Sequence, residues 1–249
     1  KVERLISSRN LRPKKKEGFL KIISIFSFLG IMLGVAILII VMSVMNGFKT
    51  DLTKKILGLN PHIVIQPNNL TIDDKFISKL KNEFQDIKIS KSFSGEGIII
   101  NNDNAKGVIF KGINKDEKRS IEFLSKNITS GNVKTFNENQ VFIGTELAHN
   151  LNLKKNDKIS LMSSSFVATP LGSLPKQESF SIAGTFTTGF LEFDQNIVIL
   201  GIDDALSIFD KEKKDQNIEI YLKNPLKANI VKNKIEKINP NYFIYTWSD

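Results

Sequence analysis

The sequence predicts an α+β protein in which one N-terminal transmembrane helix precedes an exported domain. Three observations support this class. Residues 22–45 form a run of 24 residues without a charge, two β-α-β patterns stand at the two ends of the remaining chain, and short strand patterns with turn residues lie between them. Two such β-α-β patterns that meet in space are typical of a split ferredoxin-like subdomain. The intervening segment is expected to form an inserted, mainly β subdomain.

The apolar run at 22–45 is long enough to cross a bilayer. As a helix it would measure about 36 Å, against about 30 Å of hydrocarbon. A cleaved signal peptide is the alternative, but its apolar region is normally about 7–15 residues and ends at a small-residue site. We therefore assign 22–47 to a transmembrane helix. The apolar spacing in 48–59 predicts an amphipathic extension, which Asn60 and Pro61 end.

Charge is distributed unevenly along the 249 residues, whose formal net charge is +9. Residues 1–21 carry eight basic and two acidic side chains. By the positive-inside rule this basic arm is cytoplasmic and the domain after the helix lies across the membrane. The remainder has no basic stripe with interleaved aromatic residues, so we expect no nucleic-acid binding. The chain begins with Lys1 and ends in YTWSD, and we expect it to be a piece of a longer protein.

The exported domain is expected to divide into two subdomains. The split subdomain takes 48–115 and 215–249, and the inserted β-rich subdomain takes 116–214. The expected strands of the split subdomain are 62–66, 87–93, 97–102, 107–113, 217–222 and 241–247, and its expected helices are 72–84 and 225–238. Cysteine is absent, which excludes disulfides, thiol catalysis and thiolate metal sites.

A proline-bearing segment at 163–177 is the most conspicuous feature of the inserted subdomain. It joins expected strands at 158–162 and 179–186, and this separation is too long for a tight hairpin turn. Pro170 and Pro175 stiffen it, while Leu171 and Leu174 give it an apolar tip. A stiff loop loses little entropy on binding, which favours a role in holding a partner. Alternatively, the loop folds back and its leucines cover the subdomain.

Candidate catalytic residues are few. His62 and His149 lie in no metal-binding pattern, and the glycine-rich segment 92–97 is better explained as a kink between strands than as a nucleophile elbow. Glu192 and Asp194 lie two apart on an expected strand, but nothing completes a site around them. We expect no catalytic residue, no metal site and no cofactor bound by this chain.

The sequence blocks LGVAILIIVMSVMNGF (33–48) and ILGLNPHIVI (56–65) closely resemble the first transmembrane segment and its exit in LolC/LolE-type permeases, the membrane subunits of the lipoprotein-releasing ABC transporter. The segment 141–162 is similar to that family's middle region, and TPLGSLPKQ (169–177) to its protruding hook. The resemblance implies a bacterial inner-membrane protein with a cytoplasmic N-terminus. Its periplasmic domain would comprise a porter-like and a β-rich subdomain, followed by three more membrane helices.

The resemblance also implies site residues. The hook would bind a periplasmic lipoprotein carrier similar to LolA, and Ser160 and Ala168 stand where the family has a basic and an aromatic residue. The carrier-binding residues implied are Phe166, Thr169, Pro170, Leu171, Gly172, Leu174, Pro175 and Gln177. The residues implied to contact lipid or lipoprotein are Phe26, Ile37, Ile40 and Val44.

The implied partners are a second permease subunit, in a homodimer or heterodimer, and a cytoplasmic LolD-like ATPase that holds ATP and magnesium. Lipoprotein substrates, membrane lipid and the carrier complete the set. Two other functions remain open at this point. One is a MacB-like efflux or FtsX-like permease of the same superfamily, and the other is a single-pass anchored scaffold or sensor.

Overall fold

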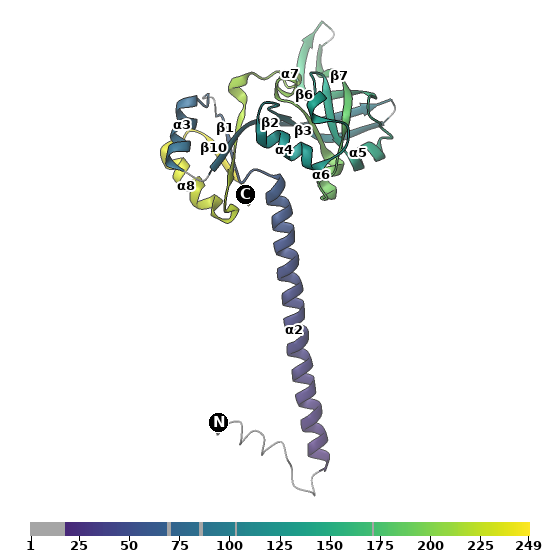
Figure 1. Cartoon of the computed structure of the whole chain (residues 1–249), viewed down its shortest axis with the longest axis vertical. Helices are drawn as coiled ribbons and strands as arrows, with labels where there is room; N and C mark the ends of the chain where they lie inside the picture. The colour runs from purple at the N-terminus through teal and green to yellow at the C-terminus, as the bar shows by residue number, and fades with distance from the viewer. Residues whose placement is uncertain (1–17, 69–70, 85–86, 103, 171) are drawn as a thin grey trace. The chain divides into compact units, whose positions relative to one another are not determined.

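The computed structural model describes residues 18–68, 71–84, 87–102, 104–170 and 172–249 (Figure 1). The chain forms two compact units, Lys1–Ile56 and Leu57–Asp249. Most of the expected basic arm, 1–21, lies outside the described residues, so its cytoplasmic position stays a prediction.

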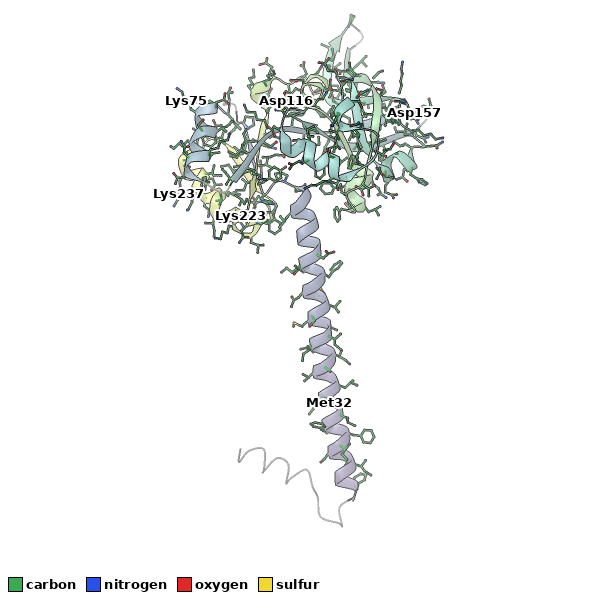
Figure 2. All side chains as sticks on the ribbon, in the orientation of Figure 1. Met32, Lys75, Asp116, Asp157, Lys223 and Lys237 are labelled. Carbon is green, nitrogen blue, oxygen red and sulfur yellow. The ribbon has the colours of Figure 1, made fainter. Side chains whose placement is uncertain are left out.

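Helix α2 (Gly18–Leu59) unites the expected membrane helix and its extension in one continuous element. It ends where Asn60 and Pro61 were expected to stop it. Its segment Ile22–Asp51 is long and apolar enough to cross a membrane, with a mean hydropathy of 2.9 in its most apolar window. No residue of that window is buried, and the side chains of this segment, Met32 among them, project outward from the helix (Figure 2).

A four-stranded antiparallel sheet with two helices forms one part of the second unit. Its strand order is β10-β1-β9-β2, which gives the β-α-β-β-α-β arrangement of a ferredoxin-like fold. Asp73 caps α3 by accepting a hydrogen bond from the Phe76 N–H at 2.8 Å. The elements are β1 (Ile63–Gln66), α3 (Asp74–Glu83), β2 (Ile87–Asn101), β9 (Asn217–Leu222), the short helix η3 (Pro225–Lys227), α8 (Ala228–Ile238) and β10 (Phe243–Thr246).

Alternation along these strands explains why the helices cover one face of the sheet. Ile63 and Ile65 of β1 and Ile218 and Ile220 of β9 are almost fully buried, in one cluster with apolar residues of α3 and α8. Side chains two apart on a strand share a face, so each strand directs one apolar row into this core.

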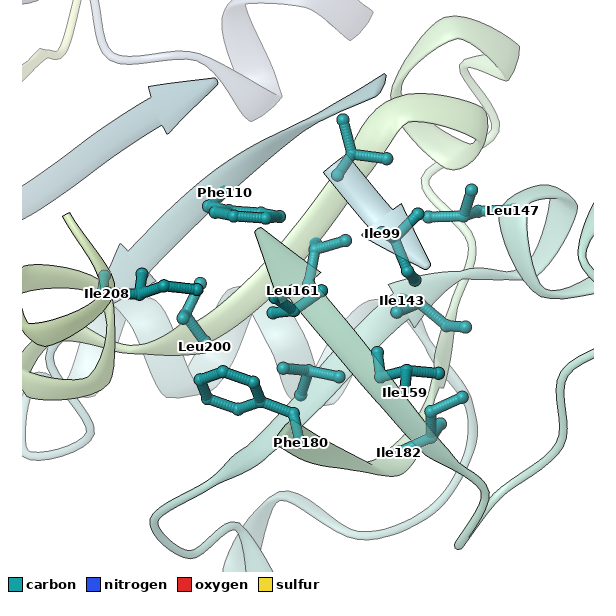
Figure 3. Packing of buried hydrophobic residues seen from close by; sticks show 14 of the residues in the cluster. Ile99, Phe110, Ile143, Leu147, Ile159, Leu161, Phe180, Ile182, Leu200 and Ile208 are labelled. Carbon is teal, nitrogen blue, oxygen red and sulfur yellow. The ribbon is translucent and has the colours of Figure 1, made fainter. Parts of the chain in front are cut away.

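Six strands close into a barrel. Pairing runs β2-β3-β8-β5-β7-β6 and returns to β2, with parallel pairs at β3/β8 and β5/β7. Ile99, Leu161 and Phe180 are among the side chains that meet in its core (Figure 3). The further elements are β3 (Asn104–Ile113), α4 (Lys118–Asn127), β4 (Ile128–Ser130), β5 (Gln140–Gly144), α5 (Thr145–Asn150), β6 (Lys158–Thr169), β7 (Gly172–Phe186), α6 (Leu191–Asn196), β8 (Ile197–Gly201) and α7 (Ile202–Ile208).

Strand β2 belongs to both sheets. The residues expected to form two strands around a glycine-rich kink form one strand of 15 residues. Its first half pairs with β9, and its second half pairs with β3 and β6. The expected division at residue 115 therefore cuts through the barrel, because β2 and β3 form two of its walls. The α+β class, with one long apolar helix, a split ferredoxin-like sheet and an inserted mainly β part, is confirmed.

Two glycines in β2 allow close packing. A Cβ at Gly97 would lie 2.4 Å from the Met162 carbonyl oxygen of β6 and 2.6 Å from the Phe110 ring. A Cβ at Gly95 would lie 2.5 Å from the Phe209 ring. The glycine-rich stretch thus serves neither as a turn nor as a nucleophile elbow. It lets β6 and the aromatic core approach the backbone of β2.

A buried ion pair ties the barrel to the four-stranded sheet across β2. Lys111 Nζ of β3 lies 3.3 Å from Glu219 Oε1 of β9, and the Tyr221 hydroxyl donates to Glu219 Oε2 at 2.6 Å. Burial alone would raise the pKa of Glu219, but the Lys111 charge and the hydrogen bonds from Tyr221 and Ser92 outweigh it and hold this pKa below its usual value. The ionised form therefore stabilises the folded state.

We expect Glu219→Gln to destabilise the chain at pH 7 by about 1–3 kcal/mol, because Lys111 loses its buried partner. Since the folded pKa of Glu219 is lowered, its contribution is present above the unfolded pKa of about 4.3 and is lost as the pH falls through the folded value. Denaturant titrations from pH 7 to pH 3, followed by fluorescence of the single tryptophan, measure both effects. Glu96→Gln, at an exposed position of β2, is the matched control. A pH profile unchanged by Glu219→Gln contradicts the prediction.

We expect Gly97→Ala to destabilise the unit Leu57–Asp249 by about 1–3 kcal/mol through overpacking. Gly107 of β3 lies opposite Ile98 and has open space around its Cβ position. Gly107→Ala should therefore leave the free energy of unfolding within about 0.5 kcal/mol of the wild-type value. The same denaturant titration at pH 7 compares the two variants. Equal effects of the two alanines would show that Gly97 is not required by close packing.

Candidate functional site

The proline-bearing segment is a β-hairpin arm, so the predicted long loop is wrong. Strands β6 and β7 continue past the barrel and pair to the end, with Val167 opposite Leu174 and Thr169 opposite Gly172 (Figure 1). Pairing therefore reaches Thr169 on β6 and Gly172 on β7. Both faces of this arm meet water, so its strands need no alternation of apolar and polar residues, which is the usual sequence signal for a strand.

The arm displays apolar side chains. Phe166 is 64% exposed, Leu174 52% and Val167 44%, and Pro170 and Pro175 are also exposed. Leu174 therefore does not cover the subdomain as the alternative reading required. Leu171 lies outside the described residues, as does the Thr169 side chain, so their roles stay predictions. The exposed side chains on this arm form an apolar surface that another molecule could cover.

Gln177, the polar residue expected beside the arm, lies at the surface. Gln177 is exposed, and its Nε2 donates to Ser160 Oγ at 2.7 Å across the β6/β7 pair. This neutral contact occupies the place where the resemblance led us to expect a basic residue. One ion pair lies near it, with Lys176 Nζ 3.5 Å from Glu178 Oε1. Gly172, the remaining site residue, follows the turn with a φ of 118°.

The root of the arm is held by hydrogen bonds that sequence reasoning missed. Regular pairing breaks between Met162 and Phe166, where β6 carries extra residues. At this bulge Ser163 Oγ donates to the Ile208 carbonyl at 2.6 Å, and Ser165 Oγ donates to the Phe209 carbonyl. From the facing strand, Lys176 Nζ donates to the Ser207 carbonyl at 2.6 Å. Both strands of the arm therefore bind the C-terminal end of α7.

That end of α7 is itself fixed. Asp210 adopts a left-handed backbone conformation with a φ of 53°. The Asp210 N–H donates to the Ser207 carbonyl at 3.0 Å, and the Lys211 N–H donates to the Leu206 carbonyl at 2.8 Å. These features define a Schellman motif at the end of the helix. The Phe209 ring packs on Phe93 and Phe110, with centroids 5.3 Å and 5.7 Å apart. The carbonyls that receive the arm are thus anchored in the barrel core.

The candidate catalytic residues have structural roles. The Leu222 N–H donates to His62 Nδ1 at 2.8 Å, which assigns the proton to Nε2, 3.0 Å from the Leu57 carbonyl. Asp194 is buried on α6 rather than on the expected strand, and it accepts three hydrogen bonds from Thr188 and Gly189. His149 and Glu192 are exposed. Among the described residues no group of three or more His, Cys, Asp or Glu side chains could hold a metal.

Asp204 of α7 is the remaining perturbed carboxyl group near this region. Burial raises its pKa, and the Asn139 N–H and the Lys115 charge oppose that rise. Its Oδ1 accepts from the Asn139 N–H at 3.4 Å. The charges of Glu138 and Glu178 also raise this pKa, so Asp204 lies among charged side chains at the start of α7.

The residues expected to meet lipid lie on α2. Phe26, Ile37, Ile40 and Val44 are 52–70% exposed and share one face of the helix, because their spacings return to the same side. The other large apolar side chains of this segment are exposed to a similar degree. Exposure does not distinguish these four residues, and their lipid contacts stay predictions.

Comparison with known proteins shows which families this chain is similar to. The family model of the MacB-like periplasmic core domain matches residues 24–238. LolC of Neisseria meningitidis, a lipoprotein-releasing system transmembrane protein, is 28% identical over 91% of this chain and 56% of its own length. The protein of the same name from Buchnera aphidicola of Schizaphis graminum is 31% identical over 92% of this chain and 57% of its own.

Among solved structures, the periplasmic region of MacB from Actinobacillus actinomycetemcomitans aligns with a TM-score of 0.48 at 10% identity, covering 78% of this chain and 91% of that one. The chain spans about half the length of the curated relatives it matches. The resemblance to LolC/LolE-type permeases that the sequence blocks indicated is confirmed by the named relatives. Since one family model matches residues 24–238, the chain belongs to the family of the MacB-like periplasmic core domain.

Proposed function

We propose that this chain is the N-terminal portion of a LolC-like permease that releases lipoproteins from the outer leaflet of the inner membrane and passes them to a periplasmic carrier held by the arm. The observation that carries the proposal is the arm itself. Phe166, Val167 and Leu174 are exposed on a stiff hairpin whose root is bound to the core. Apolar side chains on a pre-organised support bind a partner with little ordering cost.

The partners of the proposed permease follow from the names of its relatives, which belong to a lipoprotein-releasing system. A second permease subunit would form a homodimer or heterodimer with this one. A LolD-like ATPase on the cytoplasmic side would bind ATP and magnesium, and this chain would bind neither. The basic excess of 1–21 supports a cytoplasmic N-terminus and a periplasmic Leu57–Asp249 unit.

The proposed path of the lipoprotein starts on α2. Phe26, Ile37, Ile40 and Val44 would meet its acyl chains, since an apolar helix face offers them the same environment as lipid. ATP-driven closure of the two permease subunits would then push the lipoprotein towards the carrier. This step is mechanical, so it requires no catalytic residue in the chain.

Two other functions compete with this one. A MacB-like efflux or FtsX-like permease would share the family domain, but the relatives named above are LolC proteins and the arm offers a surface for a protein partner. A single-pass anchored scaffold or sensor would need no further membrane helices. The half-length coverage of the relatives favours a longer permease over this second alternative.

We expect Pro170→Arg and Leu174→Asp each to weaken carrier binding by at least about tenfold, because they place a charge in an apolar contact. The measurement is calorimetry of the chain in nanodiscs with the LolA-type carrier of the same organism. Leu171→Asp should have the same effect by the family resemblance. Leu226→Asp makes the same chemical change at a leucine that is 72% exposed outside the arm, and it should leave affinity unchanged.

Retained binding in both Pro170→Arg and Leu174→Asp would show that the arm is not the carrier site. A loss of binding in the Leu226→Asp control would assign the effect to general acidity rather than to the arm. Fluorescence of Trp247 monitors folding of each variant, and a wild-type unfolding transition is expected for all of them because every changed side chain in the described part is exposed.

A further inference from the structure

We propose that Ser163, Ser165 and Lys176 are positioning residues: by binding the C-terminal carbonyls of α7 they fix the direction of the arm and thereby set how tightly a partner is held. The first part concerns the arm alone. The second part rests on the proposed function, in which that partner is the lipoprotein carrier.

The contacts come from both strands of the arm to three successive carbonyls. Lys176 of β7 binds the Ser207 carbonyl at 2.6 Å, while Ser163 and Ser165 of β6 bind the next two. The Ser165 N–H also donates to Ser163 Oγ at 3.2 Å, which orients that hydroxyl group. Ser163 is only 4% exposed, so its hydrogen bond is shielded from water.

The arm needs such an anchor at this point. A two-stranded hairpin is marginally stable by itself, and regular pairing is interrupted between Met162 and Phe166. Beyond that interruption the arm has only its own two strands, whereas the preceding residues of β6 also pair with β2. The bulge is therefore the place where the arm would bend, and all three side chains act there.

The receiving groups suit the purpose. The last carbonyls of a helix lack the N–H partners of a continuing helix and carry the negative end of its dipole, so hydroxyl and ammonium donors bind them well. The Ser207 carbonyl already accepts from the Asp210 N–H, and its second lone pair accepts from Lys176. Lys176 is additionally 3.5 Å from Glu178, which accepts from the Ser207 hydroxyl at 3.2 Å. This pairing restricts the ammonium group to the end of α7. Phe209 is packed in the core, so these hydrogen bonds join the arm to a rigid part of the structure.

The first experiment measures the arm without any partner. The chain has no cysteine, so His149→Cys on α5 and Ser173→Cys on the arm provide two unique sites for spin labels. Double electron–electron resonance on the chain in nanodiscs gives the distribution of distances between the two spin labels. We expect Ser163→Ala with Ser165→Ala, and separately Lys176→Met, to widen the distribution at least about twofold. Widths that stay at the wild-type value in both variants overturn the proposal.

Two controls isolate the contacts. Ser164 is exposed between the two serines, and Ser164→Ala removes a hydroxyl group without touching α7. Lys155→Met removes a positive charge from an exposed turn of the same unit. Both controls should keep the wild-type width. Lys176→Met keeps the test decisive if the double serine variant fails to fold, since Lys176 lies at the surface with a side chain 24% exposed.

The second experiment adds the carrier to the unlabelled variants. We expect the same two variants to weaken its affinity about three- to tenfold through lost pre-organisation, and the controls to leave it unchanged. A fall in affinity without widening would mean that these residues touch the carrier directly, which overturns the positioning role. If the variants widen the distance distribution but the wild-type chain does not bind the carrier, the positioning role is supported. The proposed function is then refuted.

Discussion

The unit Leu57–Asp249 depends on the continuity of strand β2. One run of backbone hydrogen bonds belongs to both the four-stranded sheet and the barrel, because β2 pairs with β9 in its first half and with β3 and β6 in its second. Rotation of one sheet against the other would break this ladder, and buried backbone groups without partners are costly. The Lys111–Glu219 pair crosses the same strand. The arm continues from β6 and β7, so its position is tied through β2 to the four-stranded sheet.

The two β-α-β units could be predicted from the sequence because their signals are local. Phe76, Ile77 and Leu80 repeat at helical spacing behind the capping residue Asp73, and they are buried as that spacing implies. The continuity of β2 could not be predicted. Gly95 and Gly97 look like strand breakers in their own neighbourhood, whereas their requirement comes from Phe209 and Met162, which are distant in sequence.

The candidate site was predictable in location but not in geometry. Prolines beside exposed apolar residues indicated a partner-binding segment between the right strands. The hairpin could not be predicted from the sequence, because a strand with water on both faces has no alternation of apolar and polar residues. The hydrogen bonds that hold the root of the arm are even harder to predict from the sequence. Ser163 and Ser165 bind backbone carbonyls of α7, and a carbonyl has no residue identity that a sequence pattern could show.

The chemistry of the arm favours a reversible contact through side chains over addition of a strand. Both arm strands are edges, and edges invite pairing with other chains, but Pro175 lacks the N–H that such pairing needs and the bulge interrupts β6. What remains for a partner is apolar area, worth about 1.5–3 kcal/mol for each large side chain that becomes fully covered. Phe166, Val167 and Leu174 together supply a modest total once the cost of association is subtracted. A modest affinity suits the proposed relay, because a carrier that has received its lipoprotein must leave.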